Sequence, residues 1–318
     1  MRALTALRAA FLIIGFASAT SAAAELSCRM AITFDDLPTV GLASTDNASR
    51  LQMTENLLAL LSAREIRVTG FVNEQKLLAD GQIDAERTAI LRLWLDAGHE
   101  LGNHSYSHPD LHRTPLSEFQ ADVLRGETVL RPLLAEYDRD LAYFRHPYLH
   151  TGTDLDTKRR FESFLKDHGY KVAPVTIDNA DWVFARAFDH ALAAGDTGLA
   201  KRIGLQYVSY MIEMVIFYEG QSQQLFARNI EHVLLVHANT LNSVWFGALA
   251  DRLSDMGFEF ISLDEALEDS AYASEDRYTG PGGITWLHRW AITREVDPAM
   301  FHGEPEPPQF VVELAELP

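Results

Sequence analysis

Cysteine and basic residues are both scarce in this 318-residue sequence. Cys28 is the only cysteine, so the chain cannot form an internal disulfide. The 27 Lys and Arg residues face 45 Asp and Glu residues, which gives a formal net charge of −18. This acidity disfavours nucleic acid and anionic lipid as partners. The oligomeric state cannot be inferred from composition.

A second long apolar run is also missing, and the first lies at the very start of the chain. Arg2 and Arg8 precede an apolar stretch that ends in the small residues Ala22, Ala23 and Ala24. This order of basic, apolar and small segments predicts a signal peptide over residues 1–24. A membrane anchor or a buried first helix is the alternative. We therefore expect an exported protein, periplasmic or secreted, without stable membrane insertion after cleavage.

The rest of the chain alternates short β-rich runs with helical patterns. The expected strands are Arg29–Thr33, Val68–Val72, Ala142–Phe144, Lys171–Ile177, His232–Val236 and Phe258–Ile261, with a short one near Glu100–Gly102. The clearest helical patterns are Leu51–Leu61, Ala89–Leu95, Phe119–Leu134 and Ser243–Met256. In DAGHE, DHGYK and DMGFE we expect the Gly to end a helix directly before a strand. Such alternation predicts a parallel sheet, open or closed into a barrel.

Chemically capable side chains follow five of these strands. They are Asp35 and Asp36, His104 and His108, Arg145, Asp178 and Asp181, and His237. The carboxyl ends of parallel strands meet at one face of such a fold, where active sites are built. Each group alone has a structural explanation, since an Asp pair after a strand often caps the next helix.

His104 and His108 stand four residues apart, which places both imidazoles on one face if the segment turns helically. This spacing alone is a weak signal. Together with a carboxylate from another loop, it predicts a metal site that keeps open positions, as a catalytic site requires. The nitrogen and oxygen ligands favour one Zn²⁺ ion, although Mn²⁺, Co²⁺ or Ni²⁺ would also fit.

Five ordered motifs resemble those of carbohydrate esterase family 4, the polysaccharide deacetylase or NodB-like group. They are Thr33-Phe34-Asp35-Asp36, His104-Ser105-Tyr106-Ser107-His108, Arg145-His146-Pro147-Tyr148, Asp178-Asn179-Ala180-Asp181-Trp182 and Leu235-Val236-His237. The resemblance spans residue 29 to about residue 267. It implies an α/β fold, a distorted (β/α) barrel of about seven parallel strands.

The resemblance also implies a role for each matching residue. Asp36, His104 and His108 would bind the metal, and Asp35, kept ionised by the cation and by Arg145, would be the general base. His237 would be the general acid, oriented by Asp181, with Asp178 as the alternative. The backbone N–H of Tyr148 would help to bind the oxyanion. Pro147 and Trp182 would wall the groove, and Leu235 would line the acyl pocket.

Several other residues keep two interpretations. His99, His112, His146 and His150 crowd the same loops, and we expect them to be exposed or to lie behind the metal ligands. The WLHRW segment could offer Trp286 and Trp290 as a sugar-stacking surface. An amphipathic packing helix is the favoured explanation.

The sequence departs from the family pattern in three places. The residue after His237 is Ala238 rather than the usual Asp. A helical insert at about residues 183–230 divides the catalytic domain, residues 25–270, and a C-terminal extension covers residues 271–318. The insert carries two helical patterns, Phe184–Leu199 and Ile203–Tyr218. Because it lies between two site motifs, we expect it to wall one side of the groove.

The resemblance implies a metal-dependent hydrolase of carbon–nitrogen bonds other than peptide bonds. It would remove N-acetyl groups from peptidoglycan, a chitin-type oligosaccharide or an exported polysaccharide. The same site could instead cleave O-acetyl esters or a non-sugar amide. A carbohydrate-binding protein on an inactive scaffold is a further alternative, against which the complete set of polar residues argues.

Overall fold

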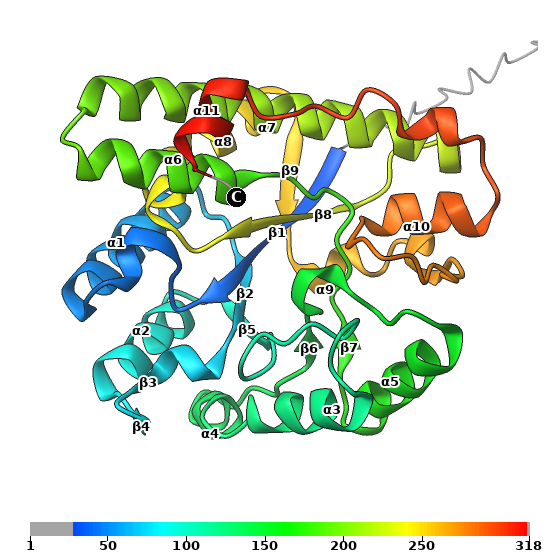
Figure 1. The fold of residues 1–318 in the computed structure, drawn as a ribbon, viewed down its shortest axis with the longest axis horizontal. Helices are drawn as coiled ribbons and strands as arrows, with labels where there is room; N and C mark the ends of the chain where they lie inside the picture. The colour runs from blue at the N-terminus through cyan, green and yellow to red at the C-terminus, as the bar shows by residue number, and fades with distance from the viewer. Residues whose placement is uncertain (1–27, 317–318) are drawn as a thin grey trace, which may run out of the picture.

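The computed structural model describes residues 28–316, apart from the side chains of residues 43 and 44. The predicted signal peptide, residues 1–24, lies outside this range. Seven parallel strands form one curled sheet, which helices surround (Figure 1). The strands are β1 (Cys28–Leu37), β2 (Val68–Val72), β5 (Glu100–Asn103), β6 (Tyr143–Phe144), β7 (Lys171–Val172), β8 (His232–His237) and β9 (Phe258–Ile261). A separate antiparallel pair comprises β3 (Leu78–Ala79) and β4 (Gln82–Ile83).

The long strand β1 lies at the centre of this sheet. It pairs with β8 through residues 30–35, with β9 through residues 28–31 and with β2 through residues 32–37. The sheet runs in the order β7-β6-β5-β2-β1-β8, and a parallel bridge between Ile177 and Leu234 links β8 to the segment after β7. The expected distorted barrel of about seven parallel strands is thereby confirmed.

Two expected strands differ from the structure by more than one residue at an end. The first was expected to end at Thr33, but β1 continues to Leu37 and so contains Asp35 and Asp36. The fourth was expected to run to Ile177, but β7 ends at Val172. Pro174 follows closely, and a proline has no N–H to donate to a ladder, so the regular pairing stops there.

Eleven α-helices cover the barrel within residues 28–316, and five of them begin at an Asp or Asn cap. They are α1 (Asn47–Ser62), α2 (Ala85–Asp96), α3 (Leu116–Arg125), α4 (Leu130–Ala135), α5 (Leu155–Asp167), α6 (Asp181–Ala193), α7 (Thr197–Phe226), α8 (Thr240–Asp255), α9 (Leu263–Ala266), α10 (Trp286–Thr293) and α11 (Gln309–Leu314). Asp46, Asp84, Asp154, Asp196 and Asn239 accept backbone N–H groups at the starts of α1, α2, α5, α7 and α8. Asp35 and Asp36 cap no helix.

The predicted glycine helix ends are confirmed. Gly98, Gly169 and Gly257 follow α2, α5 and α8, and each has a positive φ of 81° to 90°. The strands β5, β7 and β9 begin within two residues of these glycines. A left-handed residue turns the chain sharply out of the helix, so each helix leads directly back into the sheet.

The single helix expected over Phe119–Leu134 is wrong, because this stretch forms α3 and α4. The carboxylate of Glu74 accepts the backbone N–H groups of Val129 and Leu130 at 2.8 and 2.6 Å, which starts a new helix there. Gly126 lies at the break, where a Cβ atom would meet the backbone of Ser105 at 2.9 Å. The break therefore lets the segment that carries His104 and His108 approach closely.

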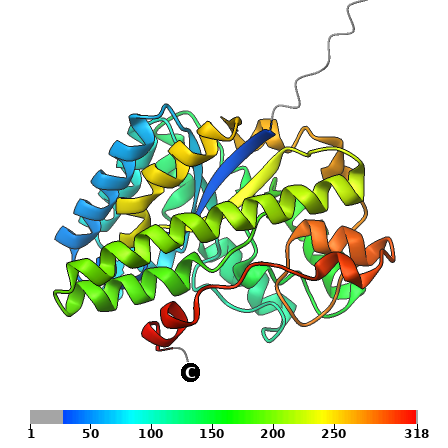
Figure 2. The ribbon, with the colours of Figure 1, turned by 90° about the horizontal axis from the view of Figure 1, so that it is seen from above.

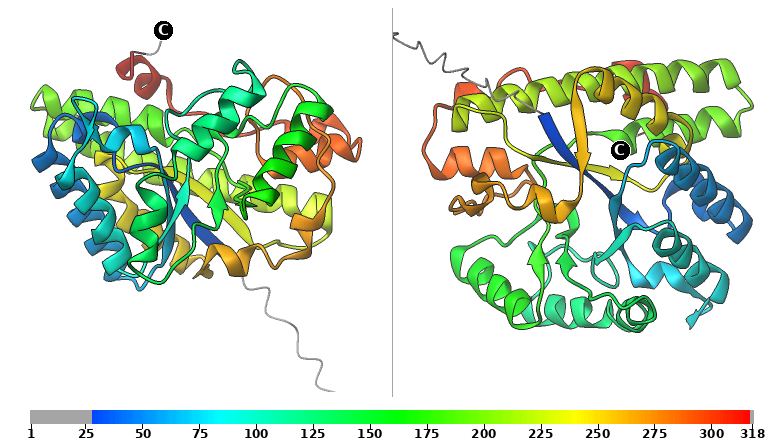
Figure 3. Two further views of the ribbon diagram at one scale, coloured as in Figure 1. Left: turned by 90° about the horizontal axis from the view of Figure 1, so that it is seen from below. Right: turned by 180° about the vertical axis from the view of Figure 1, so that it is seen from behind.

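The insert forms two helices, α6 and the 30-residue α7, which pack against each other and against α8 (Figure 2). Their bounds differ from the expected patterns, since α7 continues to Phe226. The chain after residue 270 runs along the same side of the molecule, with α10 against α7 and α11 against α6 (Figures 2 and 3). Trp286 and Trp290 are buried in α10, so the packing interpretation of WLHRW is correct.

Among the described residues, no helix combines the length and the apolar composition that a bilayer crossing needs.

Candidate active site

A cavity of about 460 Å³ opens at the carboxyl ends of the strands, where the motifs converge. It is lined by Asp35, Asp36, Val40, His104, His108, His146, Tyr148, Leu149, Asp178, Asn179, Trp182, Leu235 and His237. Residues from all five predicted motifs therefore meet in one place. Arg145 and Asp181 are buried directly behind the lining residues.

Asp36, His104 and His108 bring three ligand atoms together in this cavity. Asp36 Oδ1 lies 3.8 Å from His104 Nε2 and 3.7 Å from His108 Nε2. Two ligands that each lie about 2 Å from one ion are at most about 4 Å apart. Asp36 Oδ1 is buried and accepts no hydrogen bond from the described residues. One oxygen and two imidazole nitrogens thus fit a divalent metal ion.

Hydrogen bonds and burial prepare these side chains for a cation. The Nδ1 of His104 lies 2.9 Å from the carbonyl oxygen of Arg145, so Nδ1–H donates and Nε2 keeps its lone pair. Burial lowers the pKa of both His104 and His108 to about 4, so both rings are neutral at pH 7. Burial acts to raise the pKa of Asp36, but Lys76 and the two histidines outweigh it and hold that pKa well below its usual value.

Helix α3 stabilises the loop between His104 and His108. Asp122 of α3 accepts the backbone N–H groups of Tyr106 and Ser107 through Oδ1, at 2.9 and 3.0 Å. It also accepts the Ser107 hydroxyl at 2.6 Å. These bonds fix the backbone between the two histidines, so the rings point to the same spot.

Asp35 is paired with the fully buried Arg145. Arg145 Nη1 lies 3.2 and 3.3 Å from the two Asp35 oxygens, and its other nitrogens donate to Thr33 Oγ1 and the carbonyl of Ala173. Burial raises the pKa of the Asp35 carboxyl above its usual value, although Arg145 and His237 act in the opposite direction. Burial outweighs the attraction of Arg145 for the ionised form, so Asp35 is a stronger base than a solvated aspartate.

His237 ends β8 and is bonded to Asp181 rather than to Asp178. His237 Nδ1 lies 2.7 Å from Asp181 Oδ1, and the His237 backbone N–H donates to Oδ2 at 2.8 Å. Burial alone would lower the pKa of His237, but Asp181, Asp36 and Asp35 outweigh it and raise that pKa to about 9. Asp178 instead accepts the backbone N–H of Asn179. Burial raises the pKa of Asp178 to about 6.

The insert supports the segment that carries Asp181. The hydroxyl of Tyr210 in α7 accepts the backbone N–H of Ala180 at 3.0 Å. Tyr207, one turn earlier, donates to Asn242 Oδ1 at 2.6 Å, and Asn242 Nδ2 donates to Asp181 Oδ2 at 2.9 Å. Asn239, two residues after His237, donates to the same oxygen at 3.3 Å. Asparagines after β8 therefore stabilise Asp181.

Tyr148, Trp182 and Leu235 line the cavity as expected, and Pro147 does not. Tyr148 and Trp182 are 55% and 50% exposed, and the Tyr148 ring contacts that of His108 at a centroid distance of 4.5 Å. Leu235 is buried at the base. Pro147 is wrong as a groove wall because the turn at Pro147–Leu149 directs it into the protein.

Backbone strain gathers around this cavity. Asp36, Ser105, His108, Tyr148 and Leu149 all have positive φ angles between 54° and 72° although none is glycine. Such conformations cost free energy and persist only where the surroundings impose them, most often at functional sites. The fold therefore tolerates a less favourable backbone conformation at these five residues, which positions their side chains around the cavity.

Lys76 is a site residue that sequence reasoning missed. It lies in the 3₁₀ turn Glu74–Leu77 after β2, and its Nζ donates to the carbonyl of Asp36 at 3.0 Å and lies 3.5 Å from Asp36 Oδ1. No motif includes this lysine. Its only sequence signal is its position directly after a strand.

A second group of possible ligands, Asp110, His112 and His150, lies beside the cavity. His150 Nδ1 lies 2.6 Å from Asp110 Oδ1, and the rings of His112 and His150 stack at 3.8 Å with an interplanar angle of 4°. Stacked parallel rings direct their nitrogen lone pairs side by side rather than toward one ion. This group therefore fits a metal less well than the first.

His146 and His99, the other two histidines expected near the site, lie in different parts of the fold. His146 is buried and lines the cavity behind the predicted ligands, as expected. The placement of His99 in the same loops is wrong, since it precedes β5 and packs against Trp94 near the opposite end of the sheet.

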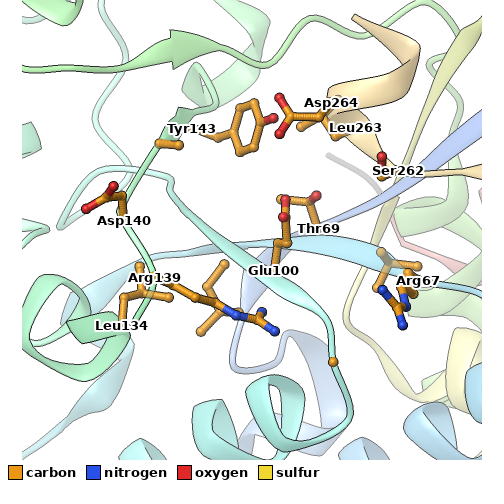
Figure 4. A pocket seen from close by; sticks show the side chains of 14 residues that line it. Arg67, Thr69, Glu100, Leu134, Arg139, Asp140, Tyr143, Ser262, Leu263 and Asp264 are labelled. Atoms are coloured by element: carbon orange, nitrogen blue, oxygen red, sulfur yellow. The ribbon is translucent and has the colours of Figure 1, made fainter. Parts of the chain in front are cut away.

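A separate cavity of about 390 Å³ lies near the amino ends of β2, β5 and β6 (Figure 4). Arg67, Arg139, Glu100 and Asp264 line it, together with Tyr143. It contains no histidine or cysteine and mixes charges of both signs. In parallel α/β barrels the active site lies at the carboxyl ends of the strands, which is the face opposite this cavity.

Comparisons with known proteins agree with these motifs. Residues 26–173 match the polysaccharide deacetylase family. A chitin deacetylase from Pestalotiopsis sp is 28% identical over 195 residues, which cover 58% of this chain and 57% of that protein. A peptidoglycan-N-acetylglucosamine deacetylase from Bacillus cereus is 25% identical over 154 residues, 48% of this chain and 46% of that protein. The chain thus spans about half the length of the curated relatives it matches.

Solved structures share the fold at low identity. A chitin deacetylase from Colletotrichum lindemuthianum is 19% identical with a TM-score of 0.50, covering 77% of this chain and 91% of that one. A carbohydrate esterase family 4 pseudoenzyme from Bacillus anthracis is 15% identical with a TM-score of 0.50, covering 76% of this chain and 66% of that one. These structures show the fold alone, and the sequence comparisons identify residues 26–173 as similar to the polysaccharide deacetylase family.

Proposed function

We propose that this protein is a metal-dependent hydrolase that removes N-acetyl groups from an acetylated amino sugar or glycan. The observation that carries this proposal is the convergence of three elements in one cavity. They are the ligand set Asp36, His104 and His108, the Asp35–Arg145 pair and the His237–Asp181 pair. Because a related fold also serves a protein described as a pseudoenzyme, the proposal rests on these residues and not on the fold.

Asp36, His104 and His108 would hold one divalent ion, with Zn²⁺ as the first candidate. When bound, such an ion polarises a carbonyl and makes a bound water more acidic. The neutral state of both imidazoles and the buried Asp36 oxygen beside them support this role. Three protein ligands leave positions open for water and substrate.

Asp35 would be the general base. Arg145 holds both of its oxygens, so the carboxylate keeps one orientation toward the cavity. The raised pKa of Asp35 makes it a better proton acceptor for an attacking water than a solvated carboxylate. Arg145 would stabilise the charged form that the reaction requires.

His237 would be the general acid. A pKa of about 9 keeps it protonated at neutral pH, and Asp181 holds Nδ1 so that Nε2–H is the proton available for transfer. An amine leaves poorly unless it is protonated, whereas an alkoxide from an acetyl ester needs less help. A protonated His237 therefore favours amide over ester hydrolysis.

The remaining cavity residues would bind the acetylated sugar. The backbone N–H of Tyr148 would donate to the oxygen on which negative charge develops. Leu235 would contact the acetyl methyl group, and the half-exposed ring of Trp182 offers a stacking surface for a sugar. The names of the two curated relatives point to chitin-type or peptidoglycan substrates, and an exported protein would meet such polymers.

An acetate-release assay on acetylated glycans tests this proposal. Zinc-loaded residues 25–318 should release acetate from N-acetylated chitin-type or peptidoglycan fragments faster than from O-acetylated xylan. Asp35→Asn should keep the zinc and the melting temperature but lose about a hundredfold or more in rate, because an amide cannot accept the proton. Equal rates for the variant and the wild type would exclude Asp35 as the base. No acetate from any substrate would contradict the deacetylase function.

A further inference from the structure

The turn that presents Tyr148 to the cavity has an unfavourable backbone conformation. Tyr148 and Leu149 are adjacent, neither is glycine, and both are left-handed, with φ angles of 56° and 54°. Two such residues in succession need external contacts to persist. The turn itself, Pro147–Leu149, has only three residues, and its own backbone hydrogen bonds run from Leu149 N–H to His146 and from His150 N–H to Pro147.

These contacts come from the C-terminal extension, through Arg289 of α10. Arg289 is fully buried, with an exposed fraction of 0%. Its Nη2 donates to the carbonyl of Leu149, and Nη1 donates to Thr151 Oγ1 at 2.7 Å. One guanidinium therefore fixes the last residue of the strained turn and a residue two positions later. A planar group with several donors suits this task better than an ammonium.

Arg289 is itself held rigidly. Its Nε donates to the carbonyl of Ile284 at 2.9 Å, and Asp276 lies 3.6 Å from Nη1. Its guanidinium lies 4.4 Å above the ring of Trp286. The backbone N–H of Trp286 donates to the carbonyl of Val175 at 2.8 Å, which ties α10 to the barrel. The strained turn is thus connected to the sheet through α10.

Gly283 contacts the turn from a second direction. A Cβ atom at this position would lie 1.8 Å from the carbonyl oxygen of Tyr148 and 2.9 Å from its carbonyl carbon. Only glycine allows the extension to approach the Tyr148 backbone this closely. Any larger residue would push the turn away from its place.

We infer that Gly283 and Arg289 are positioning residues, which together hold the Tyr148 turn in its reactive conformation. We call these two residues the C-terminal clamp. The inference rests on the proposed function for the role of the Tyr148 N–H, and it assigns a task to a segment that lies beyond the matched residues 26–173. The clamp touches none of the metal ligands, and of the residues that line the cavity it contacts only Tyr148 and Leu149, so it acts through the turn.

Arg289→Met and Gly283→Ala test the clamp, with Arg294→Met as the matched control. Arg294 follows α10 and bonds the carbonyl of Leu225 and Ser274 Oγ, away from the turn. For both clamp variants we expect kcat to fall by roughly ten- to a hundredfold while KM and zinc content change little, because a displaced N–H weakens only transition-state binding. Arg289→Lys should recover part of the loss. Arg294→Met should keep kcat within about twofold.

Hydrogen exchange of the backbone amides of His146 and of residues 148–151 provides a readout that does not depend on activity. These amides should exchange faster in Arg289→Met and in Gly283→Ala than in the wild type or Arg294→Met. Gly283→Ala retains every donor of Arg289, so it decides the matter if Arg289→Met fails to fold. Unchanged exchange at His146 and residues 148–151, or an unchanged kcat in a folded clamp variant, would overturn the inference. If the wild type deacetylates nothing, the proposed function fails, and the exchange data still decide whether the clamp exists.

Discussion

The carboxylate of Asp181 holds His237 by two hydrogen bonds, one from the ring and one from the backbone, at 2.7 and 2.8 Å. Asp181 is fully buried, and Asn239 and Asn242 also donate to it. The pair therefore has a fixed geometry, and water cannot screen its charges. Asp178, three residues earlier and lining the same cavity, makes no such bond.

Asp181→Asn should lower the pKa of His237 from about 9, because the largest stabilising charge on the imidazolium is removed. A proton NMR titration of the metal-free variant measures this pKa. Since a general acid is inactive once deprotonated, loss of activity at high pH should begin at a lower pH in the variant. Asp178→Asn is the matched control and should leave both the titration and the upper pH limit unchanged. An unshifted His237 in Asp181→Asn would contradict the proposed pairing.

Metal content separates the two groups of possible ligands. We expect one zinc ion per chain in the wild type and in His112→Ala. In His108→Ala the affinity for zinc should fall by roughly a hundredfold or more, because two remaining ligands leave the ion underfilled. Elemental analysis after dialysis measures both. Two ions per chain would show that the Asp110 group also binds zinc. Retention of zinc in His108→Ala together with its loss in His112→Ala would move the site to the Asp110 group.

The fold could be predicted where burial and turn chemistry act locally. Val68–Val72 and Phe258–Ile261 have the expected bounds because they are short β-rich runs between turn signals. The break between α3 and α4 could not be predicted, since it depends on the Glu74 carboxylate, which is more than fifty residues away in the chain. Local periodicity carries no information about such a contact.

The site also combines residues that the local sequence pattern indicates with residues that only the tertiary fold brings in. The residues of the five motifs reach one cavity because each follows a parallel strand. Lys76 beside Asp36, and Arg289 behind Leu149, belong to no motif and are brought in by the tertiary fold. Pro147 is buried at the start of a turn in which Tyr148 is left-handed, and such a φ is rare for tyrosine, so the sequence does not indicate this turn.

His288, which lies outside the candidate active site, makes the free energy of unfolding depend on pH. It is buried among the rings of Phe217, Tyr218 and Phe301, and burial lowers its pKa to about 4. The folded protein keeps His288 neutral, whereas the unfolded chain takes up a proton below about pH 6.5. Stability should therefore be lost as the pH falls from about 6.5 to 4, by up to about 1.4 kcal/mol per pH unit from this group.

His288→Phe should remove that contribution, because a phenyl ring fits the aromatic surroundings and does not titrate. Thermal unfolding at pH 7.5, 5.5 and 4.5 measures the difference between variant and wild type, which should favour the variant increasingly as the pH falls. His302→Phe alters an exposed histidine nearby and serves as the control. An equal pH dependence in wild type and His288→Phe would show that His288 does not contribute.

We expect the insert to influence which substrates can enter the cavity. Its first helix, α6, begins at Asp181, so Trp182 lies on the rim of the site cavity. A further cavity of about 500 Å³ continues past Trp182 and Val40 along α6 to Arg186 and His190. This space can hold the next sugar of a chain. Acetate release per acetyl group should therefore increase from a single sugar to a dimer or trimer.

Beyond that length, we expect no further gain and a lower efficiency on the interior of a polymer, because α6 borders both cavities on this side. A dimer-to-hexamer series and the matching polymer test both statements. Trp182→Ala should reduce the gain from the second sugar by roughly tenfold, whereas Ile216→Ala should not, since Ile216 is a 57% exposed residue of α7 that lines neither cavity. Equal or greater efficiency on the polymer interior would mean that the groove is open and that the insert does not restrict it.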